Sequence, residues 1–348
     1  METVKAYGAS SATSDLEMMH IDRRDLTGND VQIDILYCGV CHSDIHTARS
    51  EWGPASYPVV PGHEIVGKVI ATGPGVTAFK EGDLVGVGCM VDSCRECSAC
   101  REGLEQYCEN GAVMTYGGKD KHLGGHTFGG YSQNIVVDEA FVVRVPENLD
   151  IARVAPLLCA GITTWSPLRH WNVKKGDKVG VIGLGGLGHM GIKLAHALGA
   201  YVVMITRSMD KAEDAKALGA DEVLLSTDEK AMQKHANSFD FLMNTIPVGH
   251  DLNPYISLMK RDTTMAIVGA IEPLKSVHGG MLVSKRKNIA GSMIGGIEET
   301  QEMLDFCGEH NILPDVEMID MQNINEAWER VVRADVKYRF VIDMKSLQ

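Results

Sequence analysis

The sequence is poor in positive charge. Its 348 residues contain 33 Lys and Arg against 46 Asp and Glu, which gives a formal net charge of −13 at pH 7. A protein that negative repels phosphate backbones and anionic lipids, so we expect no nucleic-acid partner and no membrane-surface binding. A long apolar run is also missing. Residues 179–205, the most apolar region, are interrupted by glycines, His189, Lys193 and His196, and we expect no membrane span.

The first ten residues lack the apolar segment of a secretory signal, so the sequence predicts a reducing, cytoplasmic location. Apolar residues are otherwise plentiful: 45% hydrophobic and 23% charged residues suffice for a packed core and exclude disordered and fibrous classes. At roughly 150 residues per domain, the length predicts two domains. In a reducing compartment, nine cysteines indicate metal binding or catalysis before disulfides.

The two halves of the chain differ in pattern. The first half predicts an all-β unit, with β-branched runs bounded by turn residues at 31–37, 65–71, 84–87, 133–137 and 141–145. After about residue 150, strands alternate with helices. We predict strands at 179–182, 201–205, 223–225, 239–243 and 265–268, and a helix at 187–198 that carries an apolar stripe. This alternation predicts an α/β protein with a doubly wound parallel sheet. Helices near 298–307 and 324–333 and a strand at 338–342 follow.

A glycine-rich turn joins the first of these strands to the first helix. It reads Gly183, Leu184, Gly185, Gly186, Leu187, Gly188. The first glycine permits a tight turn, the second lets the backbone approach a pyrophosphate, and the third allows close packing of helix and strand. The pyrophosphate would accept hydrogen bonds from the free N–H groups at the helix start. An ordinary turn is the alternative, but the strand–turn–helix context favours a dinucleotide site.

The end of the second strand indicates which dinucleotide binds. An NAD site usually has Asp or Glu there to bind the ribose 2′-hydroxyl. This strand ends instead in Thr206, Arg207 and Ser208, followed by Lys211, and Asp210 stands one residue too far along. Arg207 can pair with a 2′-phosphate at two points, and Lys211 adds charge. We therefore predict NADP(H), although Arg207 as a solvated turn residue is the alternative.

Four cysteines crowd one loop: Cys94, Cys97, Cys100 and Cys108. Four thiolates complete a tetrahedral zinc shell and leave no position for substrate, so we predict a structural zinc. A pair of disulfides is disfavoured by the expected compartment. An iron–sulfur cluster is disfavoured by the long gap to Cys108 and by the absence of a following proline.

Two further cysteines and one histidine can be explained singly or together. Alone, His63 is an ordinary core or turn histidine and Cys159 a buried apolar residue. Together, Cys41, His63 and Cys159 are the two-thiolate, one-imidazole set that holds a catalytic zinc with one open position in alcohol dehydrogenases.

With these motifs in order, including Cys38 to His46, Pro61 to Glu64 and Leu158 to Gly161, the whole chain resembles the zinc-dependent medium-chain alcohol dehydrogenases. It is most similar to their cinnamyl alcohol dehydrogenase branch, which includes bacterial broad-range aldehyde reductases. The resemblance implies a GroES-like catalytic domain at 1–152 and 294–348 and a Rossmann domain at 153–293. It also implies an active site in the cleft, and a homodimer formed through the edge strand near 288–293.

The resemblance also implies roles for individual residues. Glu64 would lie behind the metal, and Asp44 would accept the ring N–H of His63. Ser43 would contact the substrate oxygen and pass a proton through the cofactor ribose to His46 near solvent. His42 would contact the pyrophosphate, and Thr163 and Ser292 would lie along the nicotinamide. For Ser43 and His46 the alternatives are a turn serine and a surface histidine.

We therefore expect NADPH-dependent reduction of aldehydes to primary alcohols, reversibly, with two zinc ions per chain. Met114 falls about where plant members carry a tryptophan, which favours a broad aldehyde range over lignin precursors; Trp52 and Trp165 are pocket or core residues. The alternatives are a zinc-free quinone or enoyl reductase, a polyol or secondary-alcohol dehydrogenase, and a zinc-lobe nucleic-acid-binding module.

Overall fold

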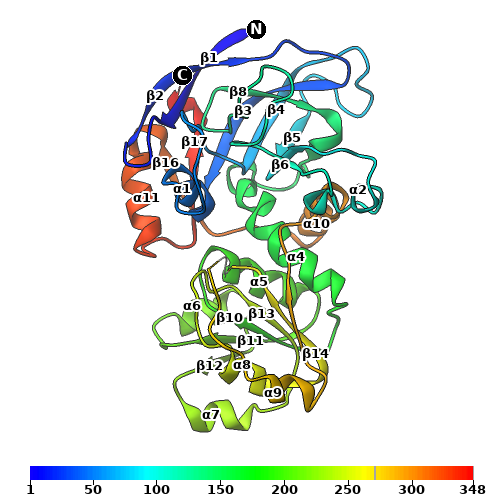
Figure 1. Ribbon diagram of the computed structural model, residues 1–348, viewed down its shortest axis with the longest axis vertical. Helices are drawn as coiled ribbons and strands as arrows, with labels where there is room; N and C mark the ends of the chain where they lie inside the picture. The colour runs from blue at the N-terminus through cyan, green and yellow to red at the C-terminus, as the bar shows by residue number, and fades with distance from the viewer. Residues whose placement is uncertain (270–271, 348) are drawn as a thin grey trace. The chain divides into compact units, whose positions relative to one another are not determined.

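The computed structural model describes residues 1–269 and 272–347. The chain divides into two compact units, the first formed by Met1–Cys159 with Gly295–Gln348 and the second by Ala160–Ile294. In Figure 1 the first unit is drawn in blue to green and orange to red, and the second in green to orange.

The first unit is built on a seven-stranded sheet. The strand order is β16-β17-β3-β4-β5-β9. Strand β8 pairs with residues 30–34 of β3, within the part of that strand that β17 leaves unpaired. Two further sheets of two strands each, β1-β2 and β6-β7, belong to the same unit. The strands of the unit are β1 Glu2–Ala9, β2 Leu16–Arg23, β3 Asp30–Val40, β4 Ile65–Thr72, β5 Leu84–Val87, β6 Met90–Asp92, β7 Val113–Met114, β8 Asn134–Asp138, β9 Val143–Arg144, β16 Val316–Asp320 and β17 Arg339–Asp343. Its helices are α1 His42–Ala48, α2 Ser98–Arg101, α3 Ile151–Val154, α10 Ile297–His310 and α11 Ile324–Val332. Single 3-10 turns are η1 Glu105–Tyr107, η2 Glu139–Phe141, η3 Ala155–Leu158, η4 Met321–Asn323 and η5 Met344–Leu347.

Strand β3, near the start of the chain, pairs with the C-terminal strand β17. It is eleven residues long and pairs antiparallel with β4 on one side and with β17 and β8 along its length. Blue β3 and red β17 lie side by side in Figure 1. Val31, Ile33 and Ile35 are buried in alternation, as a half-buried strand requires. The C-terminal strand is thus an internal part of the sheet that carries the first unit.

The structure corrects the sequence prediction in two places. The predicted strand at 141–145 is instead the turn η2, capped by Asp138, followed by the two-residue strand β9. The sequence analysis gives no strand for the hairpin β1–β2, because Glu, Lys, Ala, Gly and Asp residues of low β-propensity interrupt both of its strands. The remaining predicted strands of this half are confirmed to within a few residues.

The second unit contains a six-stranded parallel sheet in the order β12-β11-β10-β13-β14-β15. Its strands are β10 Lys178–Ile182, β11 Tyr201–Thr206, β12 Glu222–Leu225, β13 Phe239–Asn244, β14 Met259–Ile267 and β15 Asn288–Gly291. Its helices are α4 Ala160–His170, α5 Gly186–Ala197, α6 Ala212–Ala217, α7 Glu229–Lys234, α8 Asn253–Leu258 and α9 Gly279–Val283. The first strand of this sheet in sequence is β10, the next two extend it on one side to β12, and β13 then pairs with the other side of β10. The direction of strand addition therefore reverses between β10 and β13. Dinucleotides bind at this kind of switch point.

The core of the second unit explains its apolar runs. Val179, Val181 and Ile182 are buried on β10, and Val202 to Ile205 are buried on β11, as strands covered on both faces require. The predicted α/β class, with a β-rich unit and a doubly wound parallel sheet, is confirmed.

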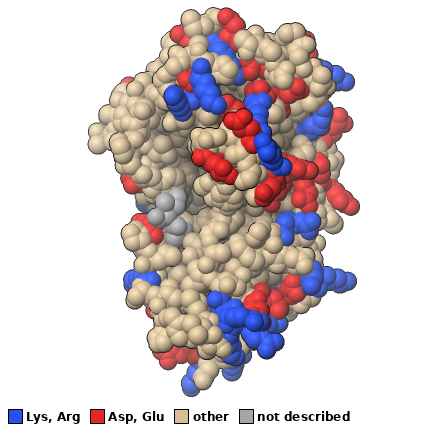
Figure 2. Space-filling view, turned by 45° about the vertical axis from the view of Figure 1, so that its right-hand side comes forward, with Lys and Arg blue, Asp and Glu red and all other residues tan. Residues whose placement is uncertain are grey.

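No helix among the described residues is long and apolar enough to span a membrane. The face drawn in Figure 2 shows acidic and basic side chains intermixed, without one continuous basic surface. The formal net charge of −13 disfavours the nucleic-acid-binding alternative.

Candidate active site

Four buried side chains converge in the first unit. One ligand atom each from Cys41, His63, Glu64 and Cys159 lies within 4.8 Å of the other three. The two cysteine Sγ atoms are 3.9 Å apart. Cys41 is the N-cap of α1, His63 and Glu64 directly precede β4, and Cys159 ends η3. Three segments that are distant in the sequence thus bring two thiols, an imidazole and a carboxyl group together.

Asp44 fixes the geometry of this cluster. Its fully buried carboxylate accepts hydrogen bonds from His63 Nδ1 at 2.9 Å, from the Gly62 N–H at 3.0 Å and from the Cys41 N–H at 3.0 Å. The bond to Cys41 is half of a capping box at the start of α1. Because His63 Nδ1 is held by the carboxylate, its Nε2 is left to face the thiols. Burial disfavours the imidazolium, yet the Asp44 carboxylate raises the pKa of His63 well above its ordinary value.

Glu64 is buried and poorly satisfied. Neither carboxyl oxygen accepts a hydrogen bond from the described residues, and the Arg339 Nη1 atom on β17 is 3.4 Å from Oε1. Burial raises the pKa of Glu64 to about 7, although Arg339 opposes the shift. Gly39 makes room for this side chain, since a Cβ at that position would lie 1.9 Å from Glu64 Oε2.

The two thiols of the cluster are not equivalent. A hydrogen bond from the Cys159 thiol lowers the pKa of Cys41 well below its ordinary value, against the effect of burial. The Arg339 guanidinium adds to this stabilisation of the thiolate. These contacts favour the thiolate form of Cys41, which is the form that ligates a metal ion.

Ser43 and His46 lie on one side of α1, three residues apart. The Cys41 Sγ atom is 3.6 Å from Ser43 Oγ. His46 Nδ1 bonds to the Glu51 carboxylate, and its ring stacks on Trp52 with centroids 4.8 Å apart. Ser43 and His46 are both partly exposed. This side of α1 therefore leads from the buried cluster to solvent.

Two neighbours of the cluster were not predicted from the sequence. The ring of buried Tyr116 lies 5.8 Å from the ring of His63. Cys89 Sγ points at the Leu158 carbonyl oxygen, 3.7 Å away, next to Cys159. Cys89 is one of the nine cysteines of the sequence, so its residue type gave a signal, whereas no local pattern marks Tyr116 or Arg339.

The four-cysteine loop forms a second cluster. The Sγ atoms of Cys94, Cys97, Cys100 and Cys108 all lie within 4.8 Å of one another. Backbone N–H groups point at these sulfurs, from Cys97 to Cys94 at 3.3 Å and from Cys94 to Cys108 at 3.4 Å. The N–H of Glu96, together with other donors, lowers the pKa of Cys94 to about 6. Such donors stabilise thiolates, so this loop fits a metal ion held by four sulfurs.

The glycine-rich turn in the second unit satisfies the steric demands of a dinucleotide site. Gly183 has φ +95°, and a Cβ on Gly188 would lie 2.1 Å from the Gly183 carbonyl oxygen. A Cβ on Gly185, the N-cap of α5, would meet no atom within 4 Å. Gly183 and Gly188 are thus required by the fold. Gly185 faces open space, where a ligand can approach the backbone.

The predicted 2′-phosphate residues follow β11. Arg207 and Ser208 are exposed, and Ser208 Oγ donates to Asp210 at 2.8 Å. Lys211 Nζ donates to the carbonyl oxygen of Leu184 at 3.3 Å, which places its ammonium group beside the glycine turn. The structure therefore puts cations at the ends of β10 and β11 and no acid at the last position of β11.

The remaining predicted residues have mixed environments. Thr163 is buried on α4, Ser292 follows β15 and donates its N–H to the Ile267 carbonyl oxygen at 3.1 Å, and His42 is exposed at the start of α1. Trp165 is buried within α4, whereas Met114 is 39% exposed on β7. Trp165 is therefore a core residue of its unit.

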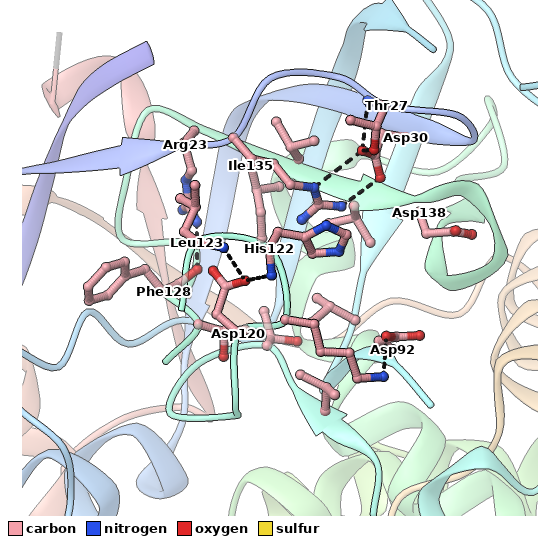
Figure 3. A pocket seen from close by; sticks show the side chains of 18 of the residues that line it. Arg23, Thr27, Asp30, Asp92, Asp120, His122, Leu123, Phe128, Ile135 and Asp138 are labelled. Carbon is pink, nitrogen blue, oxygen red and sulfur yellow. Dashed lines mark hydrogen bonds and ion pairs between the residues drawn. The ribbon is translucent and has the colours of Figure 1, made fainter. Parts of the chain in front are cut away.

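A separate cavity of about 510 Å³ lies in the first unit (Figure 3). Its described lining contains none of the predicted site residues. Ion pairs close its wall, with Arg24 2.6 Å from Asp30 and Lys121 2.9 Å from Asp92. Buried Arg23 donates to backbone carbonyls there. These charges stabilise the strands and the loop that enclose the cavity.

Comparison with known families gives two matches. Residues 27–147 match the alcohol dehydrogenase GroES-like domain, and residues 186–309 match the zinc-binding dehydrogenase model.

Comparison with individual proteins covers almost the whole chain. The aldehyde reductase YahK of Escherichia coli is 58% identical over 346 residues, which cover 99% of each chain. The structure of a cinnamyl alcohol dehydrogenase from Sorghum bicolor is 43% identical, with a TM-score of 0.95 over 99% of this chain and 98% of that one. The structure of the CAD from Helicobacter pylori complexed with NADP(H) is also 43% identical, with a TM-score of 0.92 and the same coverage.

Proposed function

Since the chain belongs to the zinc-dependent medium-chain alcohol dehydrogenases, we propose that it is an NADPH-dependent aldehyde reductase. It reduces aldehydes to primary alcohols and catalyses the reverse oxidation. The observation that carries this proposal is the buried cluster of Cys41, His63, Glu64 and Cys159, whose ligand atoms lie within 4.8 Å of one another.

The cluster fits a catalytic zinc. Cys41, His63 and Cys159 would hold the ion, because two thiolates and one imidazole leave one position for substrate. The Glu64 oxygens accept no hydrogen bond from the described residues, and besides the Arg339 ion pair they share the cluster with two thiols and an imidazole, which supports a metal cation at this place. Zinc bound there would supply Lewis-acid polarisation of an aldehyde carbonyl.

The chain's own residues orient the ligands and supply a proton. Asp44 holds the His63 ring so that Nε2 is the ligating nitrogen. Ser43 Oγ, next to Cys41, donates a proton to the oxygen of the nascent alcohol, and His46 restores it from solvent. The Glu51 carboxylate keeps the His46 ring in place for this transfer.

NADPH fits the second unit. Gly185 leaves the start of α5 open for the pyrophosphate, while Arg207, Ser208 and Lys211 bind the 2′-phosphate. His42, Thr163 and Ser292 contact the remainder of the cofactor, whose nicotinamide supplies the hydride. The H. pylori relative was solved with NADP(H), which supports this assignment.

The four-cysteine loop holds the second, structural zinc, because four thiolates leave no open position. The two zinc ions distinguish this function from a zinc-free quinone reductase.

We propose a broad range of aromatic and aliphatic aldehydes. The relatives include a bacterial aldehyde reductase and a plant cinnamyl alcohol dehydrogenase. Exposed Met114 falls about where the plant members of the branch carry a bulkier tryptophan. A polyol or secondary-alcohol dehydrogenase is the alternative.

We also propose a homodimer formed through β15. This strand is the last in its sheet, and Met293 just beyond it is 48% exposed. None of the nine cysteines, all of which lie in the described part of the chain, forms a disulfide, which supports a cytoplasmic location. Light scattering of the purified protein measures the oligomeric state.

The test combines zinc analysis with initial rates. We expect two zinc ions per chain and NADPH oxidation with aromatic and aliphatic aldehydes, with NADH a poorer donor. Zinc content near zero would refute the mechanism, and turnover of polyols alone would favour the alternative. The variant Arg207→Asp should weaken NADPH binding at least tenfold more than NADH binding, because it removes a cation from the 2′-phosphate site. Equal losses would refute the cofactor assignment.

A further inference from the structure

The loop that follows β13 lies at the switch point of the parallel sheet. Asn244, the last residue of β13, is fully buried and stands opposite Ile182 of β10 in the register. The strand order reverses between these two strands, so the carboxyl ends of β10 and β13 flank the place where a dinucleotide binds. Residues 245–250 leave the sheet at that point.

This loop packs directly on the glycine turn. Thr245 Oγ1 donates to the carbonyl oxygen of Ile182 at 2.8 Å. A Cβ on Gly183 would lie 3.0 Å from Thr245 Oγ1 and 3.4 Å from the Ile246 side chain. The conformation of residues 245–250 therefore constrains the position of the glycine turn.

A side-chain pair closes the loop. Asn244 Nδ2 is 3.0 Å from His250 Nε2, and the Ile246 N–H donates to Asn244 Oδ1 at 3.2 Å. His250 Nδ1 is 2.8 Å from the Val248 carbonyl oxygen. Because a backbone N–H can only donate, Oδ1 is the acceptor and Nδ2 must donate to His250. A carbonyl can only accept, so His250 carries its proton on Nδ1. The amide oxygen and nitrogen of Asn244 and the two ring nitrogens of His250 all make hydrogen bonds only when His250 is this tautomer of the neutral ring.

Other groups hold the same segment. The Gly249 N–H donates to Glu272 Oε2 at 2.9 Å, and the His250 ring meets the edge of Tyr255 on α8 with centroids 6.0 Å apart. Asp251, the next residue, accepts from the Asn253 N–H at 2.9 Å and so faces α8. His250 itself is partly exposed, which makes it open to substitution without disturbing the core.

We propose that His250 is a positioning residue for the cofactor. It accepts from Asn244 and donates to Val248, and thereby holds residues 245–250 in the shape that supports the glycine turn for NADPH. This inference rests on the proposed function, since NADPH is the ligand in question. His250 is not part of the cluster of Cys41, His63, Glu64 and Cys159, so we assign it a role in cofactor binding and not in the chemical step.

The test uses the full-length enzyme with zinc bound. His250→Phe keeps an aromatic ring at this position but removes both hydrogen bonds, whereas Gln at the same position offers a carbonyl acceptor and an NH2 donor. We expect His250→Phe to raise the Kd for NADPH, measured by calorimetric titration, and the KM for NADPH about five- to tenfold. His250→Gln should stay within about twofold of the wild type, and kcat at saturating NADPH should change less than about twofold in both. The control is His278→Phe, an exposed histidine of the same unit, which should leave binding unchanged.

Hydrogen exchange supplies a second readout. Amide exchange in residues 245–250 should rise in His250→Phe and return to the wild-type rate in His250→Gln. If the wild type does not bind NADPH, the proposed function fails and this inference fails with it. If the wild type binds and His250→Phe binds equally well, or if His250→Gln is as weak as His250→Phe, only this inference is wrong. Should the Phe variant fail to fold, His250→Ala is judged by the same criteria.

Discussion

The Asp44 carboxylate offers the sharpest test of how the catalytic cluster is held together. The variant Asp44→Asn keeps the size and shape of the side chain and replaces one carboxylate oxygen with an NH2 group. The amide oxygen can still accept from His63 Nδ1 and the Gly62 N–H. The NH2 group must then face the Cys41 N–H, which now donates to Oδ2 at 3.0 Å.

The expected cost follows from these three bonds. A hydrogen bond to a charged acceptor contributes about 1.5–3 kcal/mol, and here one is lost while two become neutral. Because the side chain is fully buried, water cannot replace the lost acceptor. We therefore expect Asp44→Asn to lower the free energy of unfolding by about 3–5 kcal/mol. We also expect zinc affinity to fall about 10- to 100-fold, because the His63 ring is no longer held by a carboxylate.

Urea unfolding at pH 7 measures the stability, and competition with a chelator measures zinc affinity. The matched control is Asp25→Asn, an exposed carboxyl whose pairing with the N-terminus is at the surface, and it should change stability by less than about 0.5 kcal/mol. If Asp44→Asn unfolds and binds zinc like this control, the reasoning on buried carboxylate bonds is wrong.

Three further predictions follow from geometry. Gly188→Ala should destabilise the second unit and abolish NADPH binding, because its Cβ would lie 2.1 Å from a backbone oxygen, whereas Gly185→Ala should keep the melting temperature and weaken NADPH binding only; equal melting temperatures for the two would contradict this. Cys97→Ser should lower the zinc content from two ions per chain to one and lower the melting temperature, and a variant retaining both ions would refute the four-thiolate site. Asp30→Asn should cost about 1–3 kcal/mol at pH 7, because one of its two hydrogen bonds from Arg24 is lost and the other becomes a bond to a neutral acceptor. Burial opposes ionisation of Asp30, but Arg24 and a neighbouring threonine lower its pKa. The stability from the charged group is therefore present above about pH 4 and is lost as the pH falls through the lowered pKa. Urea denaturation should show a smaller difference in unfolding free energy between wild type and Asp30→Asn at pH 3 than at pH 7.

Much of the candidate site could be predicted because its residues belong to short local motifs. The glycine turn, the four-cysteine loop and the segments around Cys41 and His63 each hold their candidate residues within a few positions. Arg339 could not be found in this way. It reaches Glu64 only because β17 pairs with β3, a contact between positions about 300 residues apart that no local periodicity encodes.

The same limit applies to parts of the fold. The β1–β2 hairpin is stabilised by pairing between its strands and by backbone bonds to residues 59 and 131, so its own sequence carries a weak signal. The strand expected at 141–145 has the right composition, but Asp138 caps a 3-10 turn there and shortens it. In both places residue composition indicates the β-propensity of the segment, whereas a local cap or pairing with other strands decides whether a strand forms.

The placement of β17 inside the first sheet has a consequence for folding. Arg339, the guanidinium nearest Glu64, belongs to β17, which pairs with β3 between positions far apart in the sequence. Glu64 therefore gains its guanidinium partner only when β17 docks on β3, so damage to this strand pairing should also reach the buried cluster of Cys41, His63, Glu64 and Cys159.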